Sequence, residues 1–135
     1  MSIPDTSAAT FPTVTTIAEL QQAIDGWIGQ FEEGYWPPLA NLARLTEEVG
    51  ELAREVNHAH GPKKKRGGEE ARVAAELSDV IIAAATLANS LGIDLTASLN
   101  ETLAALTRRD ADRWVRKETT SDASLLGEPP AEGAP

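Results

Sequence analysis

Two pairs of carboxylates stand at helical spacing in this chain. Glu48 and Glu51 lie three residues apart, Glu76 and Asp79 repeat that spacing further along, and Glu47 directly precedes the first pair. Residues three apart share one face of a helix, so each pair can present its two carboxylates together. If the pairs face each other, they form an all-oxygen pocket of the kind that binds Mg²⁺ or Mn²⁺. Such a pocket indicates chemistry on phosphates.

The angular positions of the acids decide whether they can act together. At about 100° per residue, Glu47, Glu48 and Glu51 fall within an arc of roughly 100° around the axis of one helix, and Glu48 lies nearest the apolar seam. Glu76 and Asp79 flank one side of the next seam. If the helices pack seam to seam, the two acidic edges converge at the rim of the core. One such pair is usually a solvated helix face, but facing carboxylates repel unless a cation lies between them, so two pairs predict a metal site.

A di-iron centre is the competing metal site for a helical bundle. Such proteins use Glu-x-x-His pairs on their helices, and Glu55 with His58 has that form once. The other histidine, His60, has Asn57 three residues before it. A lone pair is more simply a helix-terminal histidine facing solvent, and a site without histidine favours Mg²⁺ or Mn²⁺ over iron or zinc.

Two helices are predicted in the first half of the chain. Thr16 is an N-cap, and Glu19 completes a capping box ahead of apolar residues at helical spacing. Pro38 can open the second helix, because the first turn of a helix does not need its missing N–H. That helix stops at Gly61. Its apolar seam consists of Leu39, Leu42, Leu45, Val49, Leu52 and Val56.

Two more helices are predicted in the second half. The third runs from about Glu69 to Ser90 and is followed by Gly92, a favourable residue for the position after a helix. Either Asp94 or Thr96 caps the fourth helix, which continues to about Lys117. The seams are Val73, Leu77, Val80, Ala84, Leu87 and Leu91 in the third helix and Leu95, Leu99, Leu103 and Leu106 in the fourth.

These helices and their short connections predict an all-α fold, an antiparallel four-helix bundle. Residues 1–15 are expected to form a flexible N-terminal arm, 16–118 the folded domain, and 119–135 a disordered C-terminal tail. The apolar seams are richer than so small a chain can cover alone. We therefore expect a homo-oligomer, most simply a homodimer, with a tetramer as the alternative.

Composition narrows the class of function. A net charge of −9 argues against binding nucleic acid polymers or anionic membranes, which calls for basic patches. The absence of cysteine excludes disulfides and thiolate metal sites and fits the cytoplasm. Residues 1–15 contain no Lys or Arg and are not expected to form a secretory signal, and the most apolar run, 80–85, is too short to span a bilayer.

The segment Leu45–Leu52, followed by Glu76–Val80, resembles the signature of the MazG-like, all-α nucleoside triphosphate pyrophosphohydrolases, in which ExxE precedes ExxD. The superfamily includes the dimeric dUTPases and the phosphoribosyl-ATP pyrophosphohydrolases. The similarity continues through the basic segment after Gly61-Pro62 and through Leu91–Asp94 to Arg113, covering roughly residues 17–117.

The resemblance implies an activity and assigns roles to the acids. In this family four acids bind Mg²⁺, and an activated water attacks the α-phosphorus to release a nucleoside monophosphate and pyrophosphate. Glu48, Glu51, Glu76 and Asp79 correspond to the metal ligands. Glu47 is additional to the minimal motif and is either a further ligand or the base that orients the water, and we prefer the base.

The phosphate contacts depart from the family pattern. Many members carry an Asn and a Lys in the fourth helix where this chain has Leu103 and Ala105. The resemblance therefore leaves the substrate phosphates to Arg109, Arg113 and the basic segment 63–66, with Lys63 and Lys64 as its first two residues. The alternative is that this segment merely solubilises a turn.

The nucleobase is expected near the start of the second helix. Trp36 could stack on a base, and Asn41 could hydrogen-bond its edge. The pyrimidine-selective relatives make dUTP the first substrate expected, on resemblance alone. The alternatives are a phosphoribosyl-ATP pyrophosphohydrolase of histidine biosynthesis and a non-catalytic helical dimerisation module.

Overall fold

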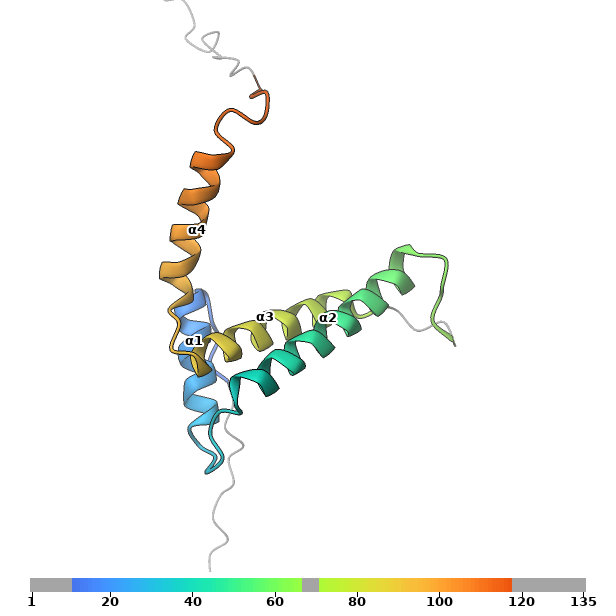
Figure 1. Ribbon diagram of the computed structural model, residues 1–135. Helices are drawn as coiled ribbons and strands as arrows, with labels where there is room; N and C mark the ends of the chain where they lie inside the picture. The colour runs from blue at the N-terminus through green and yellow to red at the C-terminus, as the bar shows by residue number, and fades with distance from the viewer. Residues whose placement is uncertain (1–10, 67–70, 118–135) are drawn as a thin grey trace, which may run out of the picture.

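The computed structural model describes residues 11–66 and 71–117, and the chain in these ranges forms four helices and no strand (Figure 1). The all-α prediction is confirmed. The expected tail, 119–135, and the first ten residues of the expected arm lie outside the described residues. The helices are α1 (Ile17–Ile28), α2 (Pro38–His60), α3 (Val73–Ser90) and α4 (Leu95–Arg109).

Most helix ends follow the local signals in the sequence. Thr16 Oγ1 accepts the N–H of Glu19 at 3.1 Å, and the Glu19 carboxylate accepts the N–H of Thr16 at 3.0 Å, so the capping box is formed. Gly92 follows α3 with a φ of 67°, a left-handed conformation that glycine adopts without strain. Asp94 caps α4 by accepting a backbone N–H at 3.1 Å.

Two helix boundaries differ from the prediction. α3 begins at Val73 rather than near Glu69, and residues 67–70 lie outside the described part of the chain. α4 ends at Arg109 rather than near Lys117, with Asp110 as its C-cap. No large apolar residue continues the seam from 107 to 113, and a carboxylate is unfavourable at the negative end of the helix dipole. The helix therefore stops where its packing face stops.

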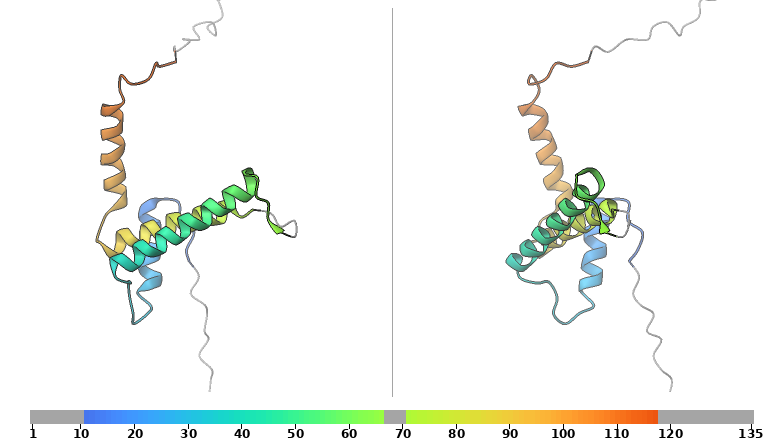
Figure 2. Two further views of the ribbon diagram at one scale, coloured as in Figure 1. Left: turned by 45° about the vertical axis from the view of Figure 1, so that its right-hand side comes forward. Right: turned by 90° about the vertical axis from the view of Figure 1, so that its right-hand side faces the viewer.

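The helices are arranged around a long α2–α3 hairpin. α2 and α3 run antiparallel and side by side, α1 crosses the end of the hairpin where α2 begins, and α4 extends away from it (Figure 1). The turned views show the same arrangement (Figure 2). α4 packs mainly against α1 and has no buried residue. One chain therefore leaves large parts of its helices uncovered.

The predicted seams are only partly buried in the hairpin. In α2, Leu39 is 81% exposed and Val49 and Val56 are also exposed, whereas Leu45 and Leu52 are half-buried. The buried residues of α2 are all polar and recur every seven residues, which keeps them on one helix face: Asn41, Glu48 and Glu55. The buried apolar residues of the described chain are few and mostly small: Ala23, Ile24, Ala83, Ala85 and Ala88.

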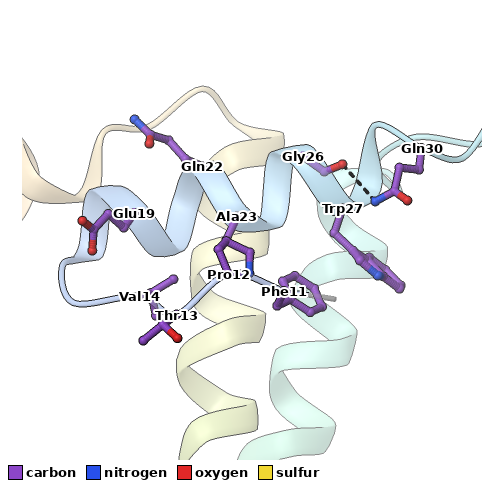
Figure 3. A pocket seen from close by; sticks show the side chains of 10 residues that line it. All are labelled: Phe11, Pro12, Thr13, Val14, Glu19, Gln22, Ala23, Gly26, Trp27 and Gln30. Atoms are coloured by element: carbon purple, nitrogen blue, oxygen red, sulfur yellow. Dashed lines mark hydrogen bonds between the residues drawn. The ribbon is translucent and has the colours of Figure 1, made fainter. Parts of the chain in front are cut away.

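The segment before α1 lies along that helix. Phe11 stacks on Trp27, with 5.5 Å between ring centroids, and Trp27 meets Phe31 edge-on at 4.9 Å. A cavity of about 340 Å³ lies between this segment and α1 (Figure 3). The aromatic contacts give residues 11–15 a defined place against the domain.

By length and composition alone, α3 is apolar enough to cross a membrane, with a mean hydropathy of 1.3 over 18 residues. A core helix of a soluble protein passes the same test. α3 lies along α2 and carries two acidic residues, Glu76 and Asp79, of which Glu76 is buried.

Candidate functional site

Three of the predicted metal ligands come together between α2 and α3. Each of Glu48, Glu76 and Asp79 offers an oxygen within 4.8 Å of the other two. Glu48 is 3% exposed and Glu76 is 7% exposed, and Glu76 Oε2 is buried with no hydrogen-bond partner. A buried carboxylate without a partner is costly, and a bound cation would remove that cost. This all-oxygen donor set fits a hard divalent ion.

The two remaining acids lie on the exposed side of α2. Glu51 is exposed and lies outside the acid cluster, one helical turn from Glu48. Glu47 is also exposed, with a carboxylate oxygen 3.7 Å from an Arg44 nitrogen. The roles of Glu51 as a ligand and of Glu47 as a base stay predictions.

Arg44 is a site residue that the sequence reasoning missed. Its guanidinium forms an ion pair with Glu48 Oε1, and its side chain lines the cavity beside the acid cluster. The available signal was the i, i+4 spacing between Arg44 and Glu48, which favours an ion pair on a helix. A guanidinium at this position is suited to bind phosphate oxygens.

A cavity of about 410 Å³ opens beside the acid cluster, on the side of α1. Glu48 and Asp79 belong to its wall, as do the two predicted base-binding residues, Trp36 and Asn41. Its volume is within the range of about 300–1,000 Å³ typical of small-molecule sites. The apolar part of the wall includes Ile24, Trp27, Ile28, Phe31, Ile82 and Ala83.

Hydrogen bonds hold the α1–α2 connection that carries Trp36. The buried Asn41 donates its Nδ2–H to the carbonyl oxygen of Trp36 at 2.9 Å, and Trp36 itself is about half exposed. Tyr35 donates its hydroxyl to Asp25 and accepts a hydrogen bond from Asn89 at 2.9 Å. Burial, together with the hydrogen bond to the Asp25 carboxylate, raises the pKa of Tyr35 to about 12. The connection is therefore fixed to α1, α2 and α3.

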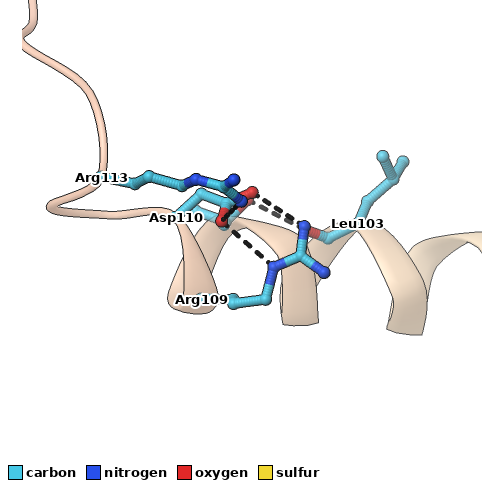
Figure 4. A network of polar contacts seen from close by, with 5 residues as sticks. Leu103, Arg109, Asp110 and Arg113 are labelled. Carbon is cyan, nitrogen blue, oxygen red and sulfur yellow. Dashed lines mark hydrogen bonds and ion pairs between the residues drawn. The ribbon is translucent and has the colours of Figure 1, made fainter.

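The predicted phosphate-binding residues fall in two places. Lys63 and Lys64 are exposed in the segment after α2, at the end of the hairpin far from α1 (Figure 1). Arg109 is the last residue of α4 and Arg113 lies in the turn that follows; they are 3.0 and 3.5 Å from Asp110 oxygens (Figure 4). Within one chain α4 points away from the hairpin, so the structure does not bring these arginines to the acid cluster. Their role as phosphate contacts stays a prediction.

Comparisons with known proteins agree with this arrangement. The MazG nucleotide pyrophosphohydrolase domain matches residues 37–114. The chain is 48% identical over 104 residues to the uncharacterized protein YpjD of Bacillus subtilis (strain 168), covering 76% of this chain and 94% of that protein. It is 34% identical over 112 residues to the dATP/dGTP diphosphohydrolase of Cyanophage S-2L, covering 83% of this chain and 90% of that protein.

A solved structure shares the fold. The crystal structure of the Bacillus-conserved MazG protein, a nucleotide pyrophosphohydrolase, aligns with a TM-score of 0.62 and 47% identity, over 74% of this chain and 98% of that one. The matched domain contains all four acids of the predicted ligand set and the cavity residues of α2 and α3. The acid cluster, the helical fold and these matches lead to one conclusion: the chain belongs to the MazG nucleotide pyrophosphohydrolase family.

Proposed function

We propose that the protein is a Mg²⁺-dependent pyrophosphohydrolase that converts a nucleoside triphosphate, or its deoxy form, into the monophosphate and pyrophosphate. The observation that carries this proposal is the buried, unpaired oxygen of Glu76, which lies in the acid cluster beside a cavity large enough for a nucleotide. The activity would act in the cytoplasm to remove unwanted nucleotides.

The acid cluster supplies the ligands for the metal. Glu48, Glu76 and Asp79 are already within reach of one ion, and the exposed side chain of Glu51 can rotate toward it from one turn away. No histidine belongs to this cluster of described residues, so its hard oxygen ligands favour Mg²⁺, with Mn²⁺ as the alternative. A divalent ion here supplies water activation and neutralises charge on the phosphates.

Two flanking residues complete the proposed chemistry. Glu47 lies on the solvent side of the cluster, where its carboxylate can orient the attacking water and accept its proton. Arg44 already lines the cavity, and its guanidinium can transfer from Glu48 to a phosphate oxygen when substrate enters.

The cavity is the proposed site for the nucleobase. The exposed face of Trp36 can stack on a base, and Asn41 holds the backbone that carries it. The resemblance to the dimeric dUTPases makes dUTP the first candidate substrate. The 34% identity to a dATP/dGTP diphosphohydrolase favours a purine deoxynucleotide as the second.

A panel of nucleotides tests this function. We expect pyrophosphate to be released from at least one (d)NTP in the presence of Mg²⁺, and the reaction to stop when EDTA removes the metal. Phosphoribosyl-ATP is included in the panel because its preferred hydrolysis would favour the alternative, a phosphoribosyl-ATP pyrophosphohydrolase of histidine biosynthesis. If no member of the panel is hydrolysed with either Mg²⁺ or Mn²⁺, the enzymatic assignment is wrong and a helical dimerisation module is favoured.

The base-binding role of Trp36 has its own test. We expect Trp36→Ala to raise KM for the best substrate about tenfold with a smaller change in kcat, because stacking on an aromatic side chain contributes roughly 1–3 kcal/mol per base. Trp36→Phe keeps an aromatic face and is the matched control, expected to retain most of the affinity. Equal KM values for wild type and Trp36→Ala would place the base elsewhere.

We also propose that the protein is a homodimer. The support is the exposed apolar surface of one chain, which includes Leu77 on α3 and Leu99 and Leu103 on α4. We expect light scattering to give about twice the chain mass of 14.4 kDa. Leu103→Glu should yield monomers, because it places a charge in the proposed contact, whereas Glu101→Gln on the same helix should not. A monomeric wild type would contradict this proposal.

A further inference from the structure

Glu55 is a buried carboxylate that the proposed reaction does not use. It is 2% exposed and lies seven residues, or two helical turns, beyond Glu48 on the same face of α2. The rise of about 1.5 Å per residue places the two positions about 10 Å apart along the helix. Glu55 also lies outside the acid cluster formed by Glu48, Glu76 and Asp79.

Glu55 contacts the α2–α3 connection on both sides of residues 67–70, at Lys65 and at Arg72. Its Oε2 lies 2.9 Å from the Lys65 ammonium and accepts the backbone N–H of Arg72 at 2.8 Å. Its Oε1 lies 3.5 Å from His58 Nδ1. Arg72 is the N-cap of α3, and its carbonyl oxygen accepts the N–H of Glu76 at 3.1 Å. One carboxylate therefore binds the basic segment on one side and the start of the metal-binding helix on the other.

The cavity, the acid cluster and the basic segment follow one another along the hairpin, with the acid cluster between the other two (Figure 1). The cavity that receives the base lies on the α1 side of the acid cluster. The basic segment lies at the opposite end of the hairpin (Figure 1). With the base in the cavity and the α-phosphorus at the acids, β- and γ-phosphates that extend away from the cavity would point toward the end that carries Lys63 and Lys64 (Figure 1).

We propose that Glu55 is a positioning residue, which rests on the proposed function: it anchors Lys65 against the start of α3 and so holds Lys63 and Lys64 where they bind the departing pyrophosphate. Lys63 and Lys64 are exposed, and they directly precede the residue that Glu55 fixes. Without the Glu55 contact, Lys65 is held less closely to the start of α3, and the two ammonium groups would meet the phosphates in a less fixed arrangement.

The test is the affinity for each product. We expect Glu55→Gln, which keeps the size of the side chain but removes its charge, to weaken the binding of pyrophosphate with Mg²⁺ about tenfold, as expected when a charge-assisted contact is lost. Binding of the nucleoside monophosphate should change less than twofold, because the cavity is untouched. Isothermal titration measures both dissociation constants directly.

Three variants separate positioning from a general loss of stability. Lys65→Arg keeps the cation and should bind pyrophosphate like the wild type. Thr16→Ala removes the α1 cap far from the hairpin end and should leave both product affinities unchanged. If Glu55→Gln does not fold, Glu55→Asp keeps the charge on a side chain too short for both contacts, and we expect the same loss of pyrophosphate affinity.

The outcomes distinguish this inference from the proposed function. If Glu55→Gln, or Glu55→Asp in its place, binds pyrophosphate as tightly as the wild type, Glu55 does not position the basic segment, while pyrophosphate release by the wild type still stands. If the binding of pyrophosphate and of the nucleoside monophosphate is weakened equally, Glu55 has only a structural role and the proposal is overturned. If the wild type releases no pyrophosphate from any nucleotide, the proposed function itself fails.

Discussion

We expect Glu76→Gln to reduce pyrophosphate release by about a thousandfold or more, because the lost charge both weakens metal binding and leaves the phosphates without their neutralising ion. Glu76 is the acid whose second oxygen is buried without a hydrogen-bond partner, so a bound cation would stabilise it more than the other acids. A steady-state assay at saturating Mg²⁺ and substrate measures the loss. Wild-type activity in this variant would show that the acid cluster is not the metal site.

The same variant should keep its fold. Glutamine has the shape of the carboxylate but removes one of three like charges within 4.8 Å, so the metal-free variant should melt at the wild-type temperature or above it. Mg²⁺ should raise the melting temperature of the wild type and not that of the variant, since only a ligand that binds the native state stabilises it. Glu101→Gln, an exposed acid on α4, is the matched control and should keep the Mg²⁺ response.

We expect Glu55→Gln to lower the melting temperature at pH 7 by about 5 °C or more, a size typical of losing charged hydrogen bonds in a domain of this length. The Arg72 N–H and the Lys65 ammonium lower the pKa of Glu55 from its ordinary value of 4.5 to about 2. Removing the charge leaves that N–H and the ammonium with a weaker acceptor. A variant with the same melting temperature as the wild type at pH 7 would contradict this role.

The pH dependence of this difference follows from the direction of the shift. The folded pKa of Glu55 lies below its unfolded value, so its stabilisation is complete above pH 4.5 and disappears as the pH falls toward 2. Glutamine resembles the protonated carboxyl group. The gap in melting temperature between wild type and Glu55→Gln should therefore be widest at neutral pH and close at low pH. Melts recorded at pH 7, 4 and 2.5 measure the gap, and a gap that widened in acid would contradict the assignment.

Most helix ends were predictable because their signals are local, whereas the start of α3 and the end of α4 were misplaced. The capping box at Thr16, the opening of α2 at Pro38 and the cap at Asp94, one of two predicted candidates, each depend on residues within one turn. Residue spacing also brought Glu48, Glu76 and Asp79 into one site, since period and helix order suffice to place them on facing helices. The reaction was predicted from the family resemblance, because residue spacing alone does not indicate which bond is hydrolysed.

The packing faces were not predictable in the same way. The predicted seam of α2 has the period of a core face, yet its members Leu39, Val49 and Val56 stay exposed, and the polar positions Asn41 and Glu48 are buried. A single sequence shows that a helix has an apolar face but not which surface covers it. Glu55 was read only as half of a possible iron motif, because its partners Lys65 and Arg72 lie across the connection and become neighbours only when the hairpin forms.

The position of water attack tests the central claim most directly. Hydrolysis of the preferred nucleotide in water labelled with ¹⁸O, followed by mass spectrometry of both products, shows which phosphorus receives the new oxygen. The acid cluster beside the base cavity predicts the label in the nucleoside monophosphate and none in the pyrophosphate. Label in the pyrophosphate, or release of orthophosphate in its place, would contradict attack at the α-phosphorus.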